Sequence, residues 1–350
     1  MRLILMGTGP FAVPSFEALR RAGHEIVFVV TRPIAMSSGK KQPPPSPVRM
    51  WAGEHSLRIS DPPSINTSES VEWLSSLRAD LMVVCDYGQI LSRDALAATN
   101  LGGINLHGSL LPRHRGAAPV QWSILAGDDI AGVSIIHMTP ALDGGPVLHR
   151  LSTPISPTEN AAELEHRLSQ IGIVSILESV AMLQDKQSIE ACKELGVQQD
   201  KALATKAPRL SKEDGELNMH YPVKWLDRLI RGLQPWPGSF AHLKLPDNKT
   251  LRIIIPMAEP IECNIATASL VPGELLFGDR LKECWPLAPQ LQGSVLCAVA
   301  TDGVLAIPYV QPAGKRLMAA DEFLRGHSRY HSMFLTGTPG EHRLLNGFQK

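Results

Sequence analysis

The stretch RLILMGTGPFAVPSFEALRRAGHEIVFVVTRP, residues 2–33, decides the fold of the N-terminal half. Its first apolar run predicts a buried strand, and Gly7 and Gly9 predict a tight turn after it. Phe16 and Leu19 then have the spacing of an amphipathic helix, and EIVFVV predicts a second strand. A strand, a helix and a second strand in this order indicate the first unit of a parallel sheet.

The same alternation continues along the chain. ADLMVVCDYG and GGINLHGS predict further strands, and SPVRMWAGEHS, SESVEWLSSLR and APVQWSILAGD predict helices. GVSIIHMTPALDGGPVLHRLSTPI predicts a hairpin-like pair of strands, and a long amphipathic helix follows it. We therefore expect an α/β domain over residues 1–190, with a Rossmann-like, mostly parallel sheet covered on both faces.

Beyond this domain the pattern changes. Residues 191–211 lose periodicity and predict a linker. In residues 212–328, YPVKWLDRLIRGLQPWPG predicts a short helix that Gly and Pro end, and several short apolar runs separated by turn residues then predict a small β-barrel or sandwich. Residues 329–350 predict a loosely held tail.

Length and composition set the outer limits. A chain of 350 residues has room for two domains, and its 34 basic residues balance its 34 acidic ones. Residues 201–350 carry 18 basic against 14 acidic side chains, an excess that suits an anionic partner on the C-terminal side. The five cysteines are scattered and odd in number, so we expect neither a disulfide framework nor a structural zinc site. The apolar run of MRLILMGTGP is too short for a secretory or membrane-spanning segment, and we expect a cytoplasmic protein.

The first glycines resemble a dinucleotide fingerprint only in part. GTGPFA fits G-x-G-x-x-A, but the second strand ends at Thr31 and Arg32, without the acidic residue that would bind a ribose. Pro10 also removes a backbone donor that a pyrophosphate would need. We therefore expect a tight turn or a wall of a substrate site, and no NAD.

Three polar residues could carry chemistry together. Asn105 and His107 are two residues apart in GGINLHGS, so they share one face of a strand that ends at the ligand-binding edge of the sheet. Asp143 follows in ALDGGP, where Gly144 and Gly145 allow a sharp turn. An amide and an imidazolium can stabilise the oxyanion that forms when an amine attacks a carbonyl, and a carboxylate can favour the charged imidazole or take the amine proton. These residues predict acyl transfer to an amine.

Other interpretations are weaker. Without G-x-S-x-G, Ser109 is disfavoured as an esterase-like nucleophile, and Cys85 is expected to be a small core residue. His114, His137 and His149 lack a ligand-type spacing with His107, so we expect no metal.

Longer segments carry a family resemblance. NLHGSLLPRHRGAAPVQWSILAGD and GVSIIHMTPALDGGPVL resemble the folate-dependent formyltransferases, whose catalytic Asn, His and Asp fall on Asn105, His107 and Asp143. LMGTGPFAVPSFEAL, GKKQPPPSPV, YGQIL, KAPRLSKEDGELN, LIRGLQPWPGSF and QPAGKRLMAADEFLRGH are similar to the branch that acts on methionyl-tRNA. The resemblance reaches to about residue 327.

The resemblance implies a reaction and its partners. It implies that 10-formyltetrahydrofolate gives its formyl group to the α-amino group of methionine on initiator tRNA, and that the second domain is an OB-like barrel facing tRNA. It places folate near the segment that follows His107, which is Ser109, Leu110, Leu111 and Pro112, and against YGQIL, which is Tyr87, Gly88, Gln89, Ile90 and Leu91. It places tRNA phosphates at Arg32, Lys40 and Lys41. We expect a monomer.

Two alternatives remain at this point. One is a formyltransferase for a small amine, such as glycinamide ribonucleotide or an amino sugar, and the other is a noncatalytic RNA-binding protein. The chain also departs from the family pattern in three places. Gly9-Pro10 replaces Pro-Asp, so an acidic residue is missing there. ALDGGP replaces GLDTGP, and residues 35–45, AMSSGKKQPPP, alter the usual loop.

Overall fold

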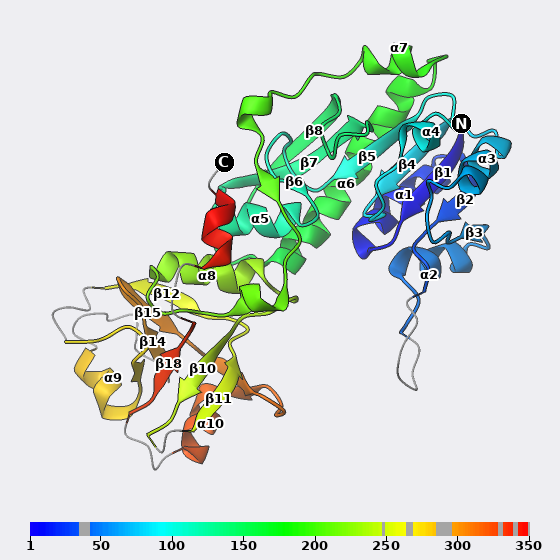
Figure 1. Ribbon diagram of the computed structural model, residues 1–350. Helices are drawn as coiled ribbons and strands as arrows, with labels where there is room; N and C mark the ends of the chain where they lie inside the picture. Colours follow the sequence, from blue (N-terminus) through cyan, green and yellow to red (C-terminus); the bar gives the residue numbers. More distant parts are fainter. Residues whose placement is uncertain are drawn as a thin grey trace. The chain divides into compact units, whose positions relative to one another are not determined.

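Two compact units make up the chain in the computed structural model (Figure 1). The structure describes residues 1–34, 43–246, 249–263, 269–284, 296–327, 332–338 and 342–348. The first unit contains Met1–Val120, Asp129–Ile155 and Glu163–Pro208. The second unit contains Gln121–Asp128, Ser156–Ala162 and Arg209–Lys350.

A seven-stranded sheet forms the centre of the first unit, in the order β3-β2-β1-β4-β5-β7-β8. Its strands are β1 (Arg2–Gly7), β2 (Glu25–Val30), β3 (Ile59–Ser60), β4 (Leu81–Cys85), β5 (Gly103–His107), β7 (Ile130–His137) and β8 (Val147–Pro154). The first five strands in this order, β3-β2-β1-β4-β5, pair in parallel. The strand β7 runs antiparallel to both β5 and β8. The expected mostly parallel sheet and the hairpin-like final pair are thus confirmed.

Helices cover both faces of this sheet, because its strands are buried on both sides. The α-helices of this unit are α1 (Val13–Arg21), α2 (Pro47–Glu54), α3 (Ser68–Ser76), α4 (Arg93–Leu96), most of α6 (Ala161–Leu183) and α7 (Ile189–Lys193). On one face, Gly172 of α6 lies against both Leu106 of β5 and Ser15 of α1. On the other face, Leu74 of α3 belongs to one buried cluster with Met82 of β4.

Local sequence explains where several helices begin and end. Ser46 and Thr67 precede α2 and α3, and each side chain accepts a hydrogen bond from the amide three residues on. After α1, Gly23 adopts a φ of +84°, which lets the chain turn back into β2.

Antiparallel sheets form the second unit. One has the order β17-β16-β11-β10-β18 and the other β12-β15-β14-β13. Their strands are β10 (Phe240–Lys244), β11 (Thr250–Ile254), β12 (Glu259–Glu262), β13 (Leu275–Leu276), β14 (Cys297–Val299), β15 (Gly303–Ala306), β16 (Tyr309–Pro312), β17 (Met318–Ala319) and β18 (Phe334–Thr336). A bridge between Glu274 and Phe334 joins the two sheets at one edge. The α-helices described in this unit are most of α5 (Pro119–Ala126), together with α8 (Val223–Gly232), α9 (Gly278–Cys284) and α10 (Ala320–Gly326).

Two segments differ from the expectation. The tail, residues 329–350, contains β18, which pairs with β10, and a 3-10 helix over Arg343–Phe348, so it belongs to the second unit. The segment 191–211, expected to be a linker, packs with the first unit as far as Pro208. There β9 (Lys206–Ala207) pairs in parallel with β6 (Arg115–Gly116). Such short strands form by pairing with distant segments and have no periodicity of their own. Among the described residues, no helix is long and apolar enough to cross a membrane.

Candidate active site

β5 carries two of the three expected catalytic residues to the carboxyl edge of the sheet. Asn105 is opposite Val84 of β4 and Ile136 of β7, and His107 is opposite Ser134 of β7. Because Leu106 faces α6, Asn105 and His107 share the opposite face. His107 is 5% exposed, whereas Asn105 is half-buried. The Asn105 side chain has no hydrogen-bond partner within the described part of the chain, so its amide is open to a ligand.

The imidazole of His107 has a fixed orientation. Its Nε2 lies 2.9 Å from the carbonyl oxygen of His114. A carbonyl can only accept, so Nε2 carries a proton and donates it. Nδ1 then faces Asp143, with 3.8 Å between Nδ1 and Oδ1. Any proton that His107 gains or loses is therefore exchanged at Nδ1, on the side of the carboxylate.

Asp143 is held from both its side chain and its backbone. Its Oδ2 accepts a hydrogen bond of 2.9 Å from the amide of Gly116. Asp143 itself adopts a φ of +48°, the left-handed region that non-glycine residues rarely occupy. Gly144 and Gly145 were expected to allow a sharp turn here, and the residue of this segment with a positive φ is Asp143 itself. Gly145 is needed for a different reason: a Cβ there would lie 1.7 Å from the carbonyl oxygen of His137.

The segment after β5, expected to bind folate, is fixed by serine side chains. Ser134 donates to the carbonyl of Ser109 and accepts from the amide of Leu111. The hydroxyl of Ser109 is fully buried and donates to the carbonyl of Arg113. Leu111 is buried too, so Leu110 and Pro112 are the more accessible members of this set.

The other expected folate segment follows β4, and Arg32 contacts it. Tyr87 and Leu91 are buried, Gly88 has a φ of +78°, and Ile90 is 60% exposed. Burial raises the pKa of Tyr87 to about 12. The guanidinium of Arg32 donates to the carbonyls of Tyr87 (3.0 Å) and Gly88 (2.6 Å).

The remaining expected residues have different environments. Gln89 accepts a hydrogen bond from the amide of Ile65. Lys40 and Lys41 lie outside the described residues. At the first turn, a Cβ on Gly9 would lie 2.0 Å from Oδ2 of Asp86, so this glycine makes room for a carboxylate. Among the described residues, no group of three His, Cys, Asp or Glu side chains could hold a metal ion.

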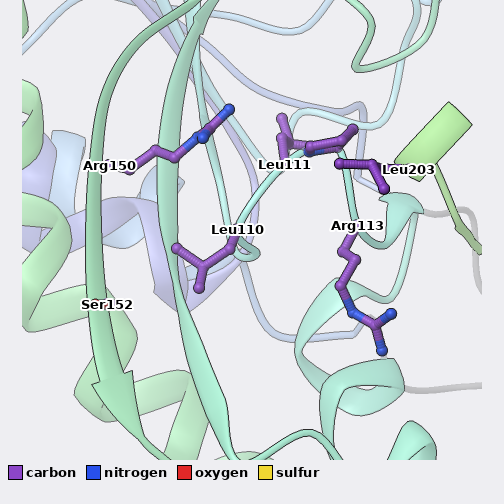
Figure 2. Close-up of a pocket in the computed structure, with 7 residues that line it drawn as sticks. Leu110, Leu111, Arg113, Arg150, Ser152 and Leu203 are labelled. Atoms are coloured by element: carbon purple, nitrogen blue, oxygen red, sulfur yellow. The ribbon is translucent and has the colours of Figure 1, made fainter. Parts of the chain in front are cut away.

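An open pocket of about 490 Å³ lies beside the segment after β5 (Figure 2). Its lining residues are Leu110, Leu111, Pro112, Arg113, Arg150, Ser152 and Leu203. Arg150 of β8 is opposite Ser134, which is itself opposite His107, so all three side chains are on one face of the sheet. Neighbouring strands are roughly 4.8 Å apart, which places the pocket about 10 Å from His107. None of the residues 87–91 lines it, so of the two expected folate segments only the one after β5 contacts this pocket.

Sequence reasoning missed one group next to Asp143. Nε2 of Gln199 donates to the carbonyls of Asp143 (2.8 Å) and Gly145 (2.7 Å). Oε1 of Gln199 accepts from Nε (3.1 Å) and Nη2 (2.7 Å) of Arg115. Thr205, nearby in sequence, accepts a hydrogen bond from the amide of His114. All of them are polar residues in irregular segments, which carry no periodic signal.

Comparison with known proteins adds to this geometry. Residues 1–180 match the family described as formyl transferase, and residues 209–328 match its C-terminal domain. The chain is 46% identical to the methionyl-tRNA formyltransferase of Rhodopirellula baltica, over 93% of this chain and 94% of that protein. It is 40% identical to the protein of the same name from Solibacter usitatus, over 93% and 96%.

Solved structures show the fold at lower identity. An N-formyltransferase from Helicobacter canadensis, solved with folinic acid and dTDP-3-aminofucose, is similar with a TM-score of 0.57 and 12% identity, covering 87% of this chain and 98% of that one. WlaRD, a sugar 3N-formyl transferase, is similar with a TM-score of 0.56 and 12% identity, covering 90% and 99%.

Proposed function

We infer the roles of the site residues from one premise: this chain belongs to the methionyl-tRNA formyltransferase family. The reaction moves a formyl group from 10-formyltetrahydrofolate to the amino group of methionine on initiator tRNA. We propose that Asn105, His107 and Asp143 carry it out. The observation that supports this most is the open Asn105 amide on the same strand face as an imidazole whose Nδ1 faces a carboxylate.

In the proposed mechanism, the amine nitrogen attacks the formyl carbon and negative charge develops on the formyl oxygen. The Asn105 amide donates to that oxygen. The amine proton passes to Nδ1 of His107, where Asp143 stabilises the imidazolium. Since Nε2 stays bonded to the His114 carbonyl, the same Nδ1 returns the proton to N10 of the folate as the C–N10 bond breaks. The proton thus ends on the leaving group, and no covalent enzyme intermediate is needed.

We further propose that the pocket beside Leu110 binds the acceptor end of the tRNA. In Figure 2, Arg150 of β8 and Arg113 lie on opposite sides of Leu110. Two guanidinium groups around an apolar floor suit a nucleotide, with phosphates at the arginines and a base or sugar against the leucines. The pocket lies on the face of His107, where the aminoacyl end must arrive.

The other assignments support this arrangement. We propose that folate binds along residues 87–91 and contacts the segment Ser109–Pro112 on the side away from the pocket beside Leu110, next to the catalytic residues. Because Arg32 holds the carbonyls of Tyr87 and Gly88, it fixes the shape of this segment, and a phosphate contact at Arg32 would have to share its guanidinium. Lys40 and Lys41 stay proposed phosphate contacts. The second domain, residues 212–328, is proposed to bind the tRNA body as part of a cytoplasmic monomer.

Incubation of the protein with labelled 10-formyltetrahydrofolate and several acceptors tests the function. We expect label on charged initiator tRNA and none on glycinamide ribonucleotide or amino sugars. Label on a small amine alone would support the alternative acceptor class, and RNA binding without folate binding by calorimetry would support a noncatalytic protein.

A further inference from the structure

We propose that Gln199 and Arg115 are positioning residues that hold Asp143 in place for proton transfer. The inference rests on the proposed role of Asp143. Gln199 lies between the two family matches, since one ends at residue 180 and the other begins at residue 209.

The contacts form a closed ring. Asp143 accepts from the amide of Gly116 through Oδ2, and its carbonyl accepts from Nε2 of Gln199. Oε1 of Gln199 accepts two hydrogen bonds from Arg115, and Arg115 is covalently joined to Gly116. Both the side chain and the backbone of Asp143 are therefore fixed to one short piece of chain.

Arginine decides which way the Gln199 amide points. A guanidinium has only donors, so the oxygen of the amide must face Arg115, and the NH₂ group must then face the two carbonyls. With Arg115 removed, Oε1 of Gln199 loses both of its donors, and the side chain is held only through its NH₂ group, so it can move away from the carbonyls of Asp143 and Gly145. Arg115 therefore acts on Asp143 through Gln199.

Asp143 needs this support because its backbone conformation is unfavourable. A non-glycine residue at a φ of +48° persists only where its surroundings hold it there. Gln199 holds carbonyls on both sides of Gly144, at Asp143 and at Gly145. A relaxed loop would move Oδ1 away from Nδ1 of His107, and the distance of 3.8 Å leaves little tolerance.

The segment that carries Gln199 is itself anchored beside the site. The amide of Arg115 donates to the carbonyl of Thr205, and the amide of Ala118 donates to that of Ala207. At Gly116, a Cβ would lie 2.4 Å from the carbonyl oxygen of Ala207. Residues 199–207 are therefore a wall of the catalytic site.

Four variants of the full-length protein test the proposal: Gln199→Ala, Gln199→Glu, Arg115→Ala and the double variant Gln199→Ala/Arg115→Ala. The control is Gln170→Ala, an exposed glutamine on α6 without a hydrogen bond in the described structure. We expect kcat to fall roughly 10- to 100-fold in each of the four, with KM for folate and for tRNA within about twofold of wild type. Because the residues act in series, the double variant should be no worse than the poorer single variant by more than about threefold.

Gln199→Glu separates this role from a simple anchor for Arg115. The carboxylate still accepts from Arg115, now as an ion pair, but has no donor for the carbonyls of Asp143 and Gly145, so the kcat of Gln199→Glu should fall as in Gln199→Ala. Wild-type kcat in Gln199→Glu, additive losses in the double variant, or losses confined to KM would overturn the proposal.

Hydrogen exchange gives a readout that does not need turnover. In Gln199→Ala, the Gly116 amide, which reports on the Asp143 carboxylate, should exchange about tenfold faster, while the amide of Leu111, held by Ser134, should not change. Unchanged protection of Gly116 would refute the positioning role even if the wild-type protein proved inactive as a formyltransferase. If the wild-type protein proved inactive but Gly116 exchanged faster in Gln199→Ala than in wild type, the proposed function would be refuted and the positioning role would stand.

Discussion

Oδ1 of Asp143 lies 3.8 Å from Nδ1 of His107, while Oδ2 of the same carboxylate accepts a hydrogen bond from the Gly116 amide. One oxygen therefore faces the imidazole and the other anchors the loop. An asparagine at position 143 would keep an oxygen that accepts from the Gly116 amide, but it would lack the negative charge beside His107. Asparagine also tolerates a positive φ well.

The first prediction concerns Asp143→Asn. We expect kcat to fall by about 10²-fold or more, because the imidazolium at Nδ1 loses its anionic partner. Thermal unfolding should change little, since the amide oxygen still accepts from Gly116. Steady-state kinetics and calorimetry check both parts, and an activity within threefold of wild type would remove Asp143 from the mechanism.

Asn105→Ala should lower kcat by about 10²- to 10³-fold and leave KM for tRNA nearly unchanged. The physical reason is that the amide is proposed to donate only to the developing oxyanion. Asn100→Ala, at an exposed position, is the matched control. A rise of KM with normal kcat would instead show that Asn105 binds the ground state.

For the arginine pocket, we expect Arg150→Ala and Arg113→Ala each to weaken tRNA binding and to leave the KM for folate unchanged. Removing one guanidinium from a phosphate should reduce the slope of log Kd against log salt by about 0.7. Filter binding over a range of salt concentrations measures the slope.

The control for the pocket is Arg21→Ala, because Arg21 ends α1 at the opposite edge of the sheet and is exposed. Removing the last two nucleotides of the tRNA should abolish the difference between Arg150→Ala and wild type. A higher KM for folate with an unchanged salt slope would show that the pocket belongs to the formyl donor.

Neighbouring glycines should respond differently to alanine. At Gly145 a Cβ would overlap the backbone of His137, so Gly145→Ala should lower the free energy of unfolding by roughly 2 kcal/mol or more. At Gly144 the closest atom to a Cβ is Cβ of Ala141 at 3.3 Å and φ is not positive, so Gly144→Ala should change the free energy of unfolding by no more than about 0.5 kcal/mol. Urea unfolding compares the two, and equal destabilisation would contradict this account of the loop.

Stability should depend on pH through Glu17. Hydrogen bonds from Arg20, together with those from Trp51 and Arg21, hold the pKa of this carboxyl well below its usual range, although burial opposes them. The lowered pKa stabilises the folded state above pH 4.5, and this contribution is lost as the pH falls further.

We therefore expect Glu17→Gln to lower the free energy of unfolding by about 1 kcal/mol at pH 7 and by progressively less below pH 4. Glu25→Gln, at an exposed ion pair, should change it less. A constant difference between wild type and Glu17→Gln from pH 7 to pH 3 would exclude the charged carboxylate as the cause.

Much of the fold could be predicted because its signals are local. The apolar run of β1, the spacing of Phe16 and Leu19 and the turn at Gly23 lie within a few residues of one another. The shared face of Asn105 and His107 likewise follows from the period of a strand. Both features depend on neighbours in sequence.

Features that depend on distant partners could not be predicted in the same way. β18 has three residues and exists through pairing with β10, and Gln199 reaches Asp143 across 56 positions. Arg32 was expected to contact phosphate, but its hydrogen bonds to Tyr87 and Gly88 depend on the ends of β2 and β4, the two strands on either side of β1. No spacing rule connects such residues.

The place of Gln199 has a consequence for how this enzyme can be divided or recombined. A hybrid joined at residue 190 would inherit its acid from one parent and the amide that steadies it from another. Exchanges of the second domain between relatives should therefore be made after Pro208, so that the Asp143 loop and its hydrogen-bond partners are inherited together.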